Sequence, residues 1–454
     1  RRLAYEFKAE FGEMKYNAAN RIIAGEWVRK QLSSIKDMRA VDVVSHMEIT
    51  VELCLLPTHN AVSAAKLSRN LDVRRRRAAI EAPRLGCPAI LPGVTTAINR
   101  IGESCLQVRK EASRVRRAGV ARTVRYLAGF GVGQKYGVHT DTLLNLARGI
   151  VERVFYTVCD GRLTRALKPK PNAFKKLNNL KKRLIDRLYP TPVVSRDEYP
   201  DLYIGRKRAI YRRAVDSLGD RPINIRDSWV STFVKAEKIN FSDKVDPAPR
   251  VIQPRATRYG VEVGRYLKLF EAELSRGFER LFGYKVILKG LNASGVGEAL
   301  HAHWKSFEQP SAVGLDASRF DQHVSVEALK WEHSVYNAVF KSDELRKLLK
   351  WQLHNHGIAR VEGYRVDYDV DGCRMSGDLN TGMGNCLLMS CMVIGYCESV
   401  GVKFRLANNG DDCVLFVEKQ DLHMLDGISE WFYDLGFRLT REEPVYVLEE
   451  VVFC

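Results

Sequence analysis

Two adjacent carboxylates at a turn are the first residues of this chain whose types suggest chemistry. Asp411 and Asp412 follow an Asn-Asn-Gly turn, and apolar runs lie on both sides of it, at 402–407 and 413–417. Two short apolar runs around Asn-Gly predict a β-hairpin whose tip carries two negative charges. Charges beside buried strands cost free energy unless a partner neutralises them, and a divalent cation is a suitable partner.

Two other segments carry residues of the same kind. Asp316 ends another apolar run, and Asp321 lies five positions later. Residues 375–386 form a glycine-rich loop that leads into an apolar helix. An Asp-Asp pair alone is most often a solvated surface turn, so the prediction of a site requires all three segments together.

The chemistry that these acids suggest is phosphoryl transfer to a sugar hydroxyl. That reaction uses two divalent ions roughly 3.5–4 Å apart, and Mg²⁺ prefers carboxylate, phosphate and water oxygens. Asp316 and Asp411, at the ends of adjacent strands, would bridge both ions, and Asp412 would complete the set.

A basic segment precedes the acids and would hold the triphosphate. Residues 231–238 have the pattern of a strand, and residues 244–258 contain three prolines, which exclude a helix. We therefore expect an extended chain whose cations point outward, which suits a triphosphate or a nucleic-acid backbone. These cations are Lys235, Lys238, Arg250, Arg255 and Arg258.

The charge of the chain is unevenly distributed. The 454 residues carry a net charge of +18, and residues 101–220 hold 26 Lys and Arg against 11 Asp and Glu. Residues 301–454 hold 15 against 24. A basic region beside an acidic one indicates one surface for a polyanion and another for cations, although a basic run by itself is more often a solvated face.

The ten cysteines show no C-x-x-C pair and no metal-binding spacing. Cys386, Cys391 and Cys397 fall on one apolar helical stretch and are expected to be buried thiols, as in a reducing compartment. No window of 18 uninterrupted apolar residues occurs, so we predict no transmembrane span.

Several elements can be expected around these motifs. Residues 1–45 have helical spacing of apolar positions, and the run Arg74–Arg77 is either a polyanion contact or a solvated linker. We place a domain boundary between residues 75 and 100, where prolines and glycines break the pattern. Expected helices cover residues 259–282, 297–307 and 325–340, and a hairpin is expected over 357–370.

Together these segments resemble the palm and fingers of viral RNA-directed RNA polymerases, in particular those of the tombusvirus and carmovirus group. Five motifs occur in the family's order, and the similarity is strong from residue 231 onward. The matching segments are 233–238 with 246–255 (motif F), 315–325 (motif A), 376–385 (motif B), 410–412 (motif C), and 442–446 with 450–454 (motifs D and E).

The resemblance implies an α+β fold. It would be a right-hand polymerase with helix-rich fingers and a palm built on an antiparallel sheet like that of an RNA-recognition motif. The implied domains are residues 1–95, the tail of a replication auxiliary region; 96–300, the basic fingers; and 301–454, a palm that stops before the thumb.

The resemblance also implies an activity, namely template-directed RNA synthesis from ribonucleoside triphosphates that replicates a positive-strand RNA virus genome. Asp316, Asp411 and Asp412 would hold two Mg²⁺ or Mn²⁺ ions. The residues that sense the ribose 2′-hydroxyl would be Asp321, Ser376, Thr381 and Asn385. A site built to hydrogen-bond a hydroxyl rejects substrates that lack it.

Simpler roles remain open for two of these residues. Asn385 could be a helix cap or a buried amide, and Ser376 could be a helix N-cap. The implied partners are the RNA template and product, the ribonucleoside triphosphates, a viral auxiliary replication protein, host factors and further copies of the chain. The implied location is the host cytoplasm, at membrane-bound replication sites reached through segments outside this chain.

One position departs from the family's pattern. Thr440 stands where relatives usually carry a motif D lysine, and the neighbouring Arg441 is a poor proton donor because arginine hardly deprotonates. The role of that lysine is therefore unassigned. A reverse transcriptase is a weaker alternative, since such enzymes usually carry a bulky aromatic at the position of Asp321. A non-catalytic RNA-binding replication factor would explain the basic region but not the three acidic motifs.

Overall fold

The structure is a computed structural model that divides the chain into two compact units. Unit 1 combines Arg1–Val94, Ala121–Thr140 and Ala236–Pro247, and unit 2 combines Thr95–Val120, Asp141–Lys235 and Ala248–Cys454. The structure describes residues 7, 10, 11, 24, 26–28, 89–95, 105–111, 122–126, 136–159, 162–241 and 246–453. The run Arg74–Arg77 and most of the predicted N-terminal helices lie outside these residues.

The described part of unit 1 is built from short antiparallel strand pairs. Strand β1 (Ala89–Pro92) pairs with β3 (Thr123–Tyr126), and β4 (Tyr136–Gly137) pairs with β9 (Ile239–Asn240). Near the N-terminus, Phe7 is buried. Its ring lies 4.8 Å from that of Phe11 and 5.4 Å from that of Trp27, measured between centroids. These contacts fit the helical spacing predicted for that segment.

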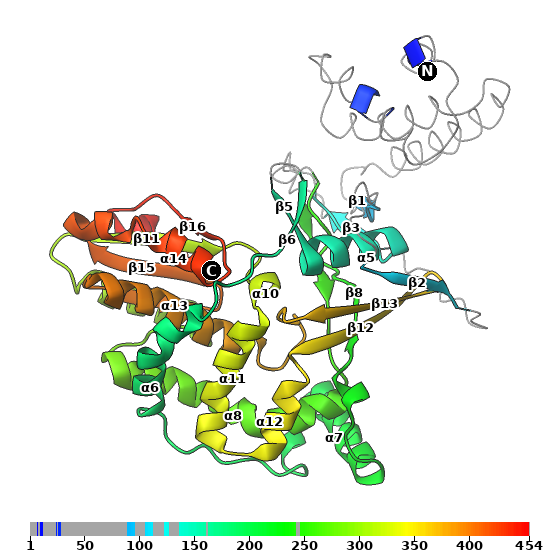
Figure 1. Ribbon diagram of the computed structural model, residues 1–454, viewed down its shortest axis with the longest axis horizontal. Coiled ribbons are helices and arrows are strands. Elements are labelled where there is room, and N and C mark those ends of the chain that lie inside the picture. The colour runs from blue at the N-terminus through cyan, green and yellow to red at the C-terminus, as the bar shows by residue number, and fades with distance from the viewer. Residues whose placement is uncertain are drawn as a thin grey trace. The chain divides into compact units, whose positions relative to one another are not determined.

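Unit 2 contains a four-stranded antiparallel sheet that carries the acidic motifs. Its strand order is β14-β15-β11-β16, and Figure 1 shows β11 in yellow-green beside the orange and red strands of the C-terminal part. The bounds are Arg405–Asn408 for β14, Asp412–Glu418 for β15, Pro310–Ala317 for β11 and Leu439–Arg441 for β16. The predicted hairpin around the Asn-Asn-Gly turn is therefore confirmed, as is the α+β class.

The two faces of this sheet belong to different cores because side chains alternate along a strand. Val313 and Leu315 of β11 point into the large core, together with Leu415 of β15. Ala312 and Phe416 point to the opposite face, which packs on a smaller apolar cluster. Asp316 and Asp412 have the parity of this second face and lie at its end.

Helix α13 (Thr381–Val400) is the central helix of the large core. It is apolar on all sides, and Figure 1 shows it along one face of the sheet. Its length and composition would allow it to cross a membrane, but most of its residues are buried inside the protein, as in the core helix of a globular domain. Cys386, Cys391 and Cys397 are buried on it, as predicted.

Other helices complete the large core. Helix α8 (Thr257–Phe282) and helix α11 (Val326–Phe340) both contribute buried aromatic side chains, and Ser325 caps α11 by accepting a hydrogen bond from the Ala328 amide. The helices predicted over 259–282 and 325–340 are thus confirmed. Helix α9 (Ala293–Trp304) begins four residues before the predicted start, because Asn292 caps it by accepting from the Gly295 amide.

Unit 2 also contains a second four-stranded sheet, with strand order β2-β13-β12-β7. Strands β12 (His354–Val361) and β13 (Tyr364–Asp371) form the predicted hairpin, and β2 (Gln107–Lys110) and β7 (Val230–Ser231) flank it. The two-residue turn that joins β12 to β13 consists of Glu362 and Gly363, both with positive φ, as expected for a tight hairpin.

Unit 2 contains further elements, most of them short; the longest is α7 (Gly205–Asp220). They are α5 (Leu143–Ile150), η2 (Val151–Phe155), β5 (Tyr156–Cys159), β6 (Arg162–Arg165), η3 (Ala173–Leu177), α6 (Asn178–Ile185), η4 (Tyr199–Leu202), α7 (Gly205–Asp220), η5 (Ile225–Ser228), β8 (Phe233–Val234), β10 (Val251–Ile252), α10 (Phe320–His323), α12 (Asp343–Lys350), η6 (Lys419–Leu425), α14 (Ile428–Asp434) and η7 (Leu448–Glu450).

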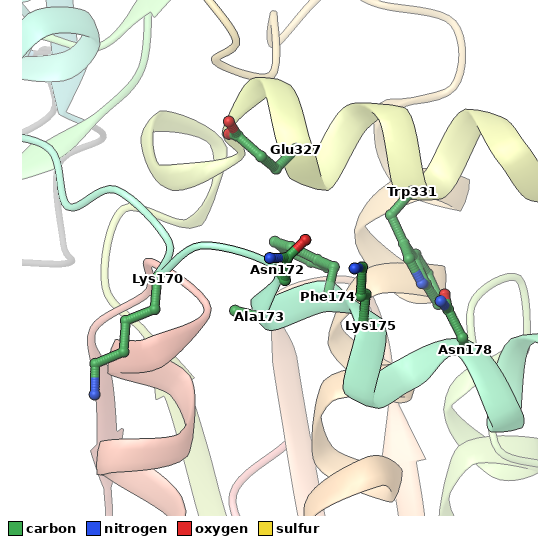
Figure 2. A pocket seen from close by; sticks show the side chains of 8 residues that line it. All are labelled: Lys170, Asn172, Ala173, Phe174, Lys175, Asn178, Glu327 and Trp331. Atoms are coloured by element: carbon green, nitrogen blue, oxygen red, sulfur yellow. The ribbon is translucent and has the colours of Figure 1, made fainter.

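A cavity of about 190 Å³ opens where η3 and the start of α6 approach α11. Figure 2 shows Phe174 and Lys175 facing Trp331 of α11 across it. Its single acidic lining residue is Glu327, whose carboxylate points away from these side chains in Figure 2. None of the predicted site residues lines this cavity, so it is separate from the acidic motifs.

The second sheet offers a test of how tightly these elements pack. A Cβ at Gly357 would lie 2.1 Å from the Tyr368 ring, whose hydroxyl is fixed by hydrogen bonds of 2.7 Å to Thr232 and Gln253. Gly357→Ala should therefore lower the free energy of unfolding by about 1–3 kcal/mol. Gly297, inside α9, has open space around it, so Gly297→Ala should raise that free energy by up to about 1 kcal/mol. Urea unfolding of both variants checks the pair, and equal effects would contradict this packing.

Candidate active site

The acids of two separate motifs meet on neighbouring strands. In the antiparallel ladder of β11 and β15, Asp316 is directly opposite Asp412. Side chains opposite each other in such a ladder stand on the same face with their Cβ atoms about 4.5–5.5 Å apart. Asp411 precedes Asp412 in the hairpin turn, so the three predicted carboxylates come from one end of one sheet.

The turn that carries Asp411 is held by the side chain of Asn408. The Asn408 amide donates to the Gly410 carbonyl at 2.8 Å and its oxygen accepts from the Gly410 amide at 3.1 Å. Gly410 has φ +106°, a left-handed conformation that glycine adopts without strain. Asn408 is fully buried, whereas Asp411 and Asp412 are exposed. A rigid turn thus presents two carboxylates to solvent.

Negative charge accumulates at this end of the sheet. Although Asp412 is exposed as a residue, partial burial of its carboxyl group raises the pKa above its usual value, and the charges of Asp411, Asp316 and Glu442 raise it further. Glu442 was not assigned to the site from the sequence, yet its carboxylate packs over Gly314, where a Cβ would lie only 1.9 Å from it. The raised pKa means that these carboxylates repel one another, and a cation would relieve the repulsion.

The donor set fits a hard divalent cation in its chemistry. All of its members are carboxylates, which Mg²⁺ and Mn²⁺ prefer. Within the described parts of the chain, no three His, Cys, Asp or Glu side chains are already arranged as a complete metal site. The carboxylates would therefore have to adjust their rotamers, and a substrate would supply further ligands, as is usual for Mg²⁺.

Asp321 and Asn385, both predicted to read the sugar, are hydrogen-bonded to each other. The Asn385 amide donates to Asp321 Oδ1 at 2.8 Å. Asp321 lies in the short helix α10, which follows β11 after Arg319 turns the chain with φ +52°. Burial raises the pKa of Asp321, and Asp411 adds to this, while the Asn385 hydrogen bond and the charges of Arg374 and Arg250 lower it.

Ser376 and Thr381, the other two predicted sugar contacts, hold the glycine-rich loop. Ser376 Oγ donates to the Val251 carbonyl and accepts from the Gln253 amide, both at 3.2 Å. Thr381 Oγ1 donates to the Met375 carbonyl at 2.9 Å. Helix α13 starts at Thr381 with Asn380 at its N-cap position, so the alternative of Ser376 as N-cap is wrong. For Asn385, the cap alternative is wrong and the buried amide is confirmed.

The loop is also joined to the basic segment through the backbone. Gly377 forms a parallel bridge with Pro254, and a Cβ at Gly377 would lie 2.5 Å from the Pro254 backbone. Asp378 pairs with Arg255 through two hydrogen bonds to its carboxylate. Only glycine allows this approach, so the loop and the segment 251–255 form one tied structure.

The predicted cations fall into three groups. Arg255 and Arg258 are buried: Arg255 pairs with Asp378, and Arg258 with Asp227 at 3.1 Å, in the first turn of α8. The expectation that the chain is extended as far as residue 258, with these two cations pointing outward, is therefore wrong. Both guanidinium groups form buried ion pairs within the fold.

Arg250 is placed differently. It is exposed, and its positive charge lowers the pKa of Asp321, one of the predicted sugar contacts. Lys235, in the same unit, is joined to it by a 2.8 Å backbone hydrogen bond from the Lys235 amide to the Arg250 carbonyl. Lys238 belongs to unit 1, where its ammonium lies 4.3 Å from the centroid of the Tyr136 ring.

A cavity of about 310 Å³ beside the glycine-rich loop contains residues that the sequence analysis missed. Its other wall is formed by Tyr203, Lys207 and Tyr211 of η4–α7 and by Lys268 of α8. Lys207 lies 4.7 Å from the centroid of the Tyr203 ring. The regular spacing of Tyr and Lys in a basic stretch was a usable signal, because rings interleaved with cations suit nucleic acid.

Comparison with known proteins identifies the family. A family model described as viral RNA dependent RNA polymerase matches residues 108–454. The chain belongs to this polymerase family. A second model, tombusvirus p33, matches residues 1–60.

Individual relatives of this chain carry the name RNA-directed RNA polymerase. That of Pothos latent virus (isolate Pigeonpea/India) is 44% identical over 91% of this chain and 57% of its own length. That of Turnip crinkle virus is 45% identical over 83% and 48%, and that of Tomato bushy stunt virus (strain Cherry) 40% identical over 100% and 55%. The chain thus spans about half the length of these relatives, and the resemblance to the tombusvirus and carmovirus group is confirmed.

The departure of this chain from the family's pattern at Thr440 has a structural counterpart. Thr440 of β16 is the ladder partner of Asp316 on the side away from Asp412. Arg441 forms an ion pair of 2.7 Å with Asp426. Arginine here is bound to a carboxylate and remains charged, so it is not available as a proton donor.

The repulsion among the acids predicts a metal-dependent gain in stability. In the presence of a chelator, Asp412→Asn should raise the melting temperature, because it removes one of several mutually repelling charges. The corresponding gain in the free energy of unfolding should be below about 1 kcal/mol, since the carboxylate is exposed. Mg²⁺ should raise the melting temperature of the unaltered protein but raise that of Asp412→Asn less. Differential scanning calorimetry with and without Mg²⁺ checks both effects. Asp343→Asn, at an exposed carboxylate on α12, is the control, and an identical Mg²⁺ response in all three proteins would contradict a cation site.

Proposed function

We propose that this protein copies RNA, joining ribonucleoside triphosphates in the order set by an RNA template and thereby replicating the genome of a positive-strand RNA virus. One observation carries the proposal: Asp316 stands opposite Asp412 at the end of the sheet whose hairpin turn holds Asp411. The family membership and the names of the relatives support it.

In the proposed reaction, Asp316, Asp411 and Asp412 hold two Mg²⁺ or Mn²⁺ ions. When bound, such ions activate the attacking 3′-hydroxyl and neutralise the pyrophosphate leaving group. The chain itself contributes a rigid arrangement: the β11–β15 register fixes Asp316 against Asp412, and the Asn408-held turn fixes Asp411. Positioning of this kind is most of what a protein supplies in phosphoryl transfer.

The nucleotide would lie between the acids and the glycine-rich loop. Arg250 would contact its phosphates, since this cation is exposed and its charge acts on Asp321. Asp321 and Asn385 would contact the ribose 2′-hydroxyl, and Ser376 and Thr381 would keep the loop in place for them. An RNA strand would follow the cavity lined by Lys207 and Tyr211, where rings and ammonium groups face the loop.

The domain names of the family follow from this proposal. The sheet β14-β15-β11-β16 with helices α11 and α13 would be the palm, and the basic region before residue 300 would belong to the fingers. Template and product RNA, ribonucleoside triphosphates and a p33-like auxiliary protein would be its partners, the last supported by the p33 match over residues 1–60. Host factors, self-association and a site of action on host cytoplasmic membranes are part of the same proposal.

The central test removes the metal-binding acids. Asp411→Ala and Asp316→Ala should each abolish Mg²⁺-dependent incorporation of labelled nucleotide on an RNA template, because each removes a carboxylate that would hold the ions. Binding of the template, measured by fluorescence anisotropy, should persist, since the carboxylates repel phosphates. Asp343→Ala should leave incorporation intact. Extension by Asp411→Ala at the unaltered rate would show that the metals are held elsewhere.

The two kinds of arginine in the basic segment should behave differently. Arg250→Gln should raise the KM for nucleotide with little change in the melting temperature, because Arg250 would meet the phosphates. Arg258→Gln should instead lower the melting temperature and leave that KM unchanged, because the buried carboxylate of Asp227 loses its 3.1 Å partner and keeps only the longer 3.7 Å contact with Arg221. Steady-state kinetics and thermal unfolding of both variants separate the two roles, and an unchanged KM in Arg250→Gln would remove this arginine from the nucleotide site.

A further inference from the structure

A fully buried ion pair lies directly behind the residues proposed to read the sugar. The side chains of Arg374 and Glu332 have no exposed surface, and the two Nη atoms of the guanidinium donate to the two oxygens of the carboxylate. Arg374 belongs to the segment before the glycine-rich loop, and Glu332 to the middle of α11. Two charges without water cost free energy unless each is fully hydrogen-bonded, so the pair calls for a reason.

The third edge of the guanidinium connects the pair to Asn385. Arg374 Nε donates to Asn385 Oδ1 at 3.1 Å, and Asn385 Nδ2 donates to Asp321 Oδ1 at 2.8 Å. Because Arg374 can only donate, it forces the amide oxygen of Asn385 to face inward. The amide nitrogen must then face Asp321. A chain of donors thus runs from a buried cation to the carboxylate of α10.

The carboxylate of Glu332 serves a second arm of the same network. It accepts from Asn380 Nδ2 at 3.0 Å and from the Tyr336 hydroxyl at 2.7 Å. Asn380 Oδ1 in turn accepts from Gln352 at 3.1 Å. Asn380 stands at the start of α13. Glu332 therefore holds two groups in place, the guanidinium of Arg374 and the end of the glycine-rich loop.

A glycine makes room for the pair on α13. A Cβ at Gly384 would lie 2.4 Å from Glu332 Oε1 and 2.5 Å from Arg374 Nη2. The pair therefore occupies the space beside the helix residue that precedes Asn385. Any side chain at 384 would displace the guanidinium from the amide that it orients.

We propose that Glu332 and Arg374 are positioning residues for sugar selection: they hold the Asn385 amide in one orientation, and through it they hold Asp321 where a 2′-hydroxyl is recognised. The inference rests on the proposed function. Neither residue touches the nucleotide. Their contribution is to leave one oxygen of Asp321 and one N–H of Asn385 free of competing partners within the network.

The physical reason for this arrangement lies in the symmetry of an amide. Without Arg374, the oxygen and nitrogen of Asn385 could exchange places, and the oxygen would then face the carboxylate of Asp321. Two acceptors facing each other repel, so Asp321 would move or take up a proton, and its contact with a hydroxyl would be lost. A site that hydrogen-bonds a hydroxyl gains its selectivity from this contact.

An ordinary stabilising ion pair is the alternative, and the chain contains one for comparison. Glu262 of α8 is also fully buried, and it accepts from Arg196 at 2.6 Å and from Arg265 at 3.0 Å. None of these three residues contacts the loop or the acids among the hydrogen bonds of the described chain. Glu262→Gln is therefore a matched control for Glu332→Gln.

The test compares incorporation of a ribonucleotide with that of the corresponding 2′-deoxynucleotide, in the intact protein with RNA template and Mg²⁺. Arg374→Lys keeps a cation against Glu332, but an ammonium cannot hold the carboxylate and the Asn385 oxygen in the geometry of a planar fork. We expect its ratio of kcat/KM for ribo over deoxy to fall about ten- to a hundredfold, the effect of losing one hydrogen bond to a charged group. The ratio should fall because kcat/KM for the ribonucleotide decreases, while kcat/KM for the deoxynucleotide stays the same.

Stability is measured on the same proteins by thermal unfolding. Glu332→Gln and Glu262→Gln should both lower the melting temperature, but only Glu332→Gln should reduce the ribo-to-deoxy ratio. If Glu332→Gln does not fold, the decision falls to Arg374→Lys alone. An unchanged ratio in folded Arg374→Lys would overturn the positioning role, as would an equal reduction in Glu262→Gln. Absence of any incorporation by the unaltered protein would overturn the proposed function instead.

Discussion

The mutual repulsion of a few carboxylates is the constraint around which unit 2 is organised. A folded chain gains nothing by pairing Asp316 with Asp412 across a ladder, since like charges directly opposite each other are destabilising. The pairing persists because the strands that carry them are fixed by apolar residues on both faces, such as Leu315 and Phe416. The core therefore supplies the free energy that holds the acids together, and a cation can return part of it.

Local patterns were enough to predict much of this arrangement. The hairpin at Asn408–Asp411 followed from Asn-Gly between apolar runs, and the spacing of apolar residues predicted a helix over 325–340, where the structure has α11. Side-chain alternation then placed Asp316 and Asp412 on one face once the strands were known to pair. These features depend on neighbours in sequence, which is why a sequence can reveal them.

The rest depended on partners that lie far apart in the chain. Arg255 and Arg258 were expected at the surface, because a positive charge in an extended segment does not disclose that Asp378 or Asp227 will cover it. The role of Glu332 could not be predicted for the same reason. Its partner Arg374 lies 42 positions away, and in the sequence Glu332 is one acid on an amphipathic helix. Burial of charge is decided by tertiary contacts, and no local spacing encodes it.

The tie between Gly377 and Pro254 gives the molecule a mechanical property. Segment 251–255 continues directly from Arg250, and the loop 376–380 continues directly into the helix that carries Asn385. Because the two backbones are in contact without an intervening side chain, a shift of one drags the other. If a nucleotide binds as proposed, a displacement at its phosphate end would thereby be transmitted to its sugar end. Phosphate binding and sugar selection would then depend on the rigidity of the same backbone contact. A substitution at Gln253 or Pro254 that loosens this contact would weaken both.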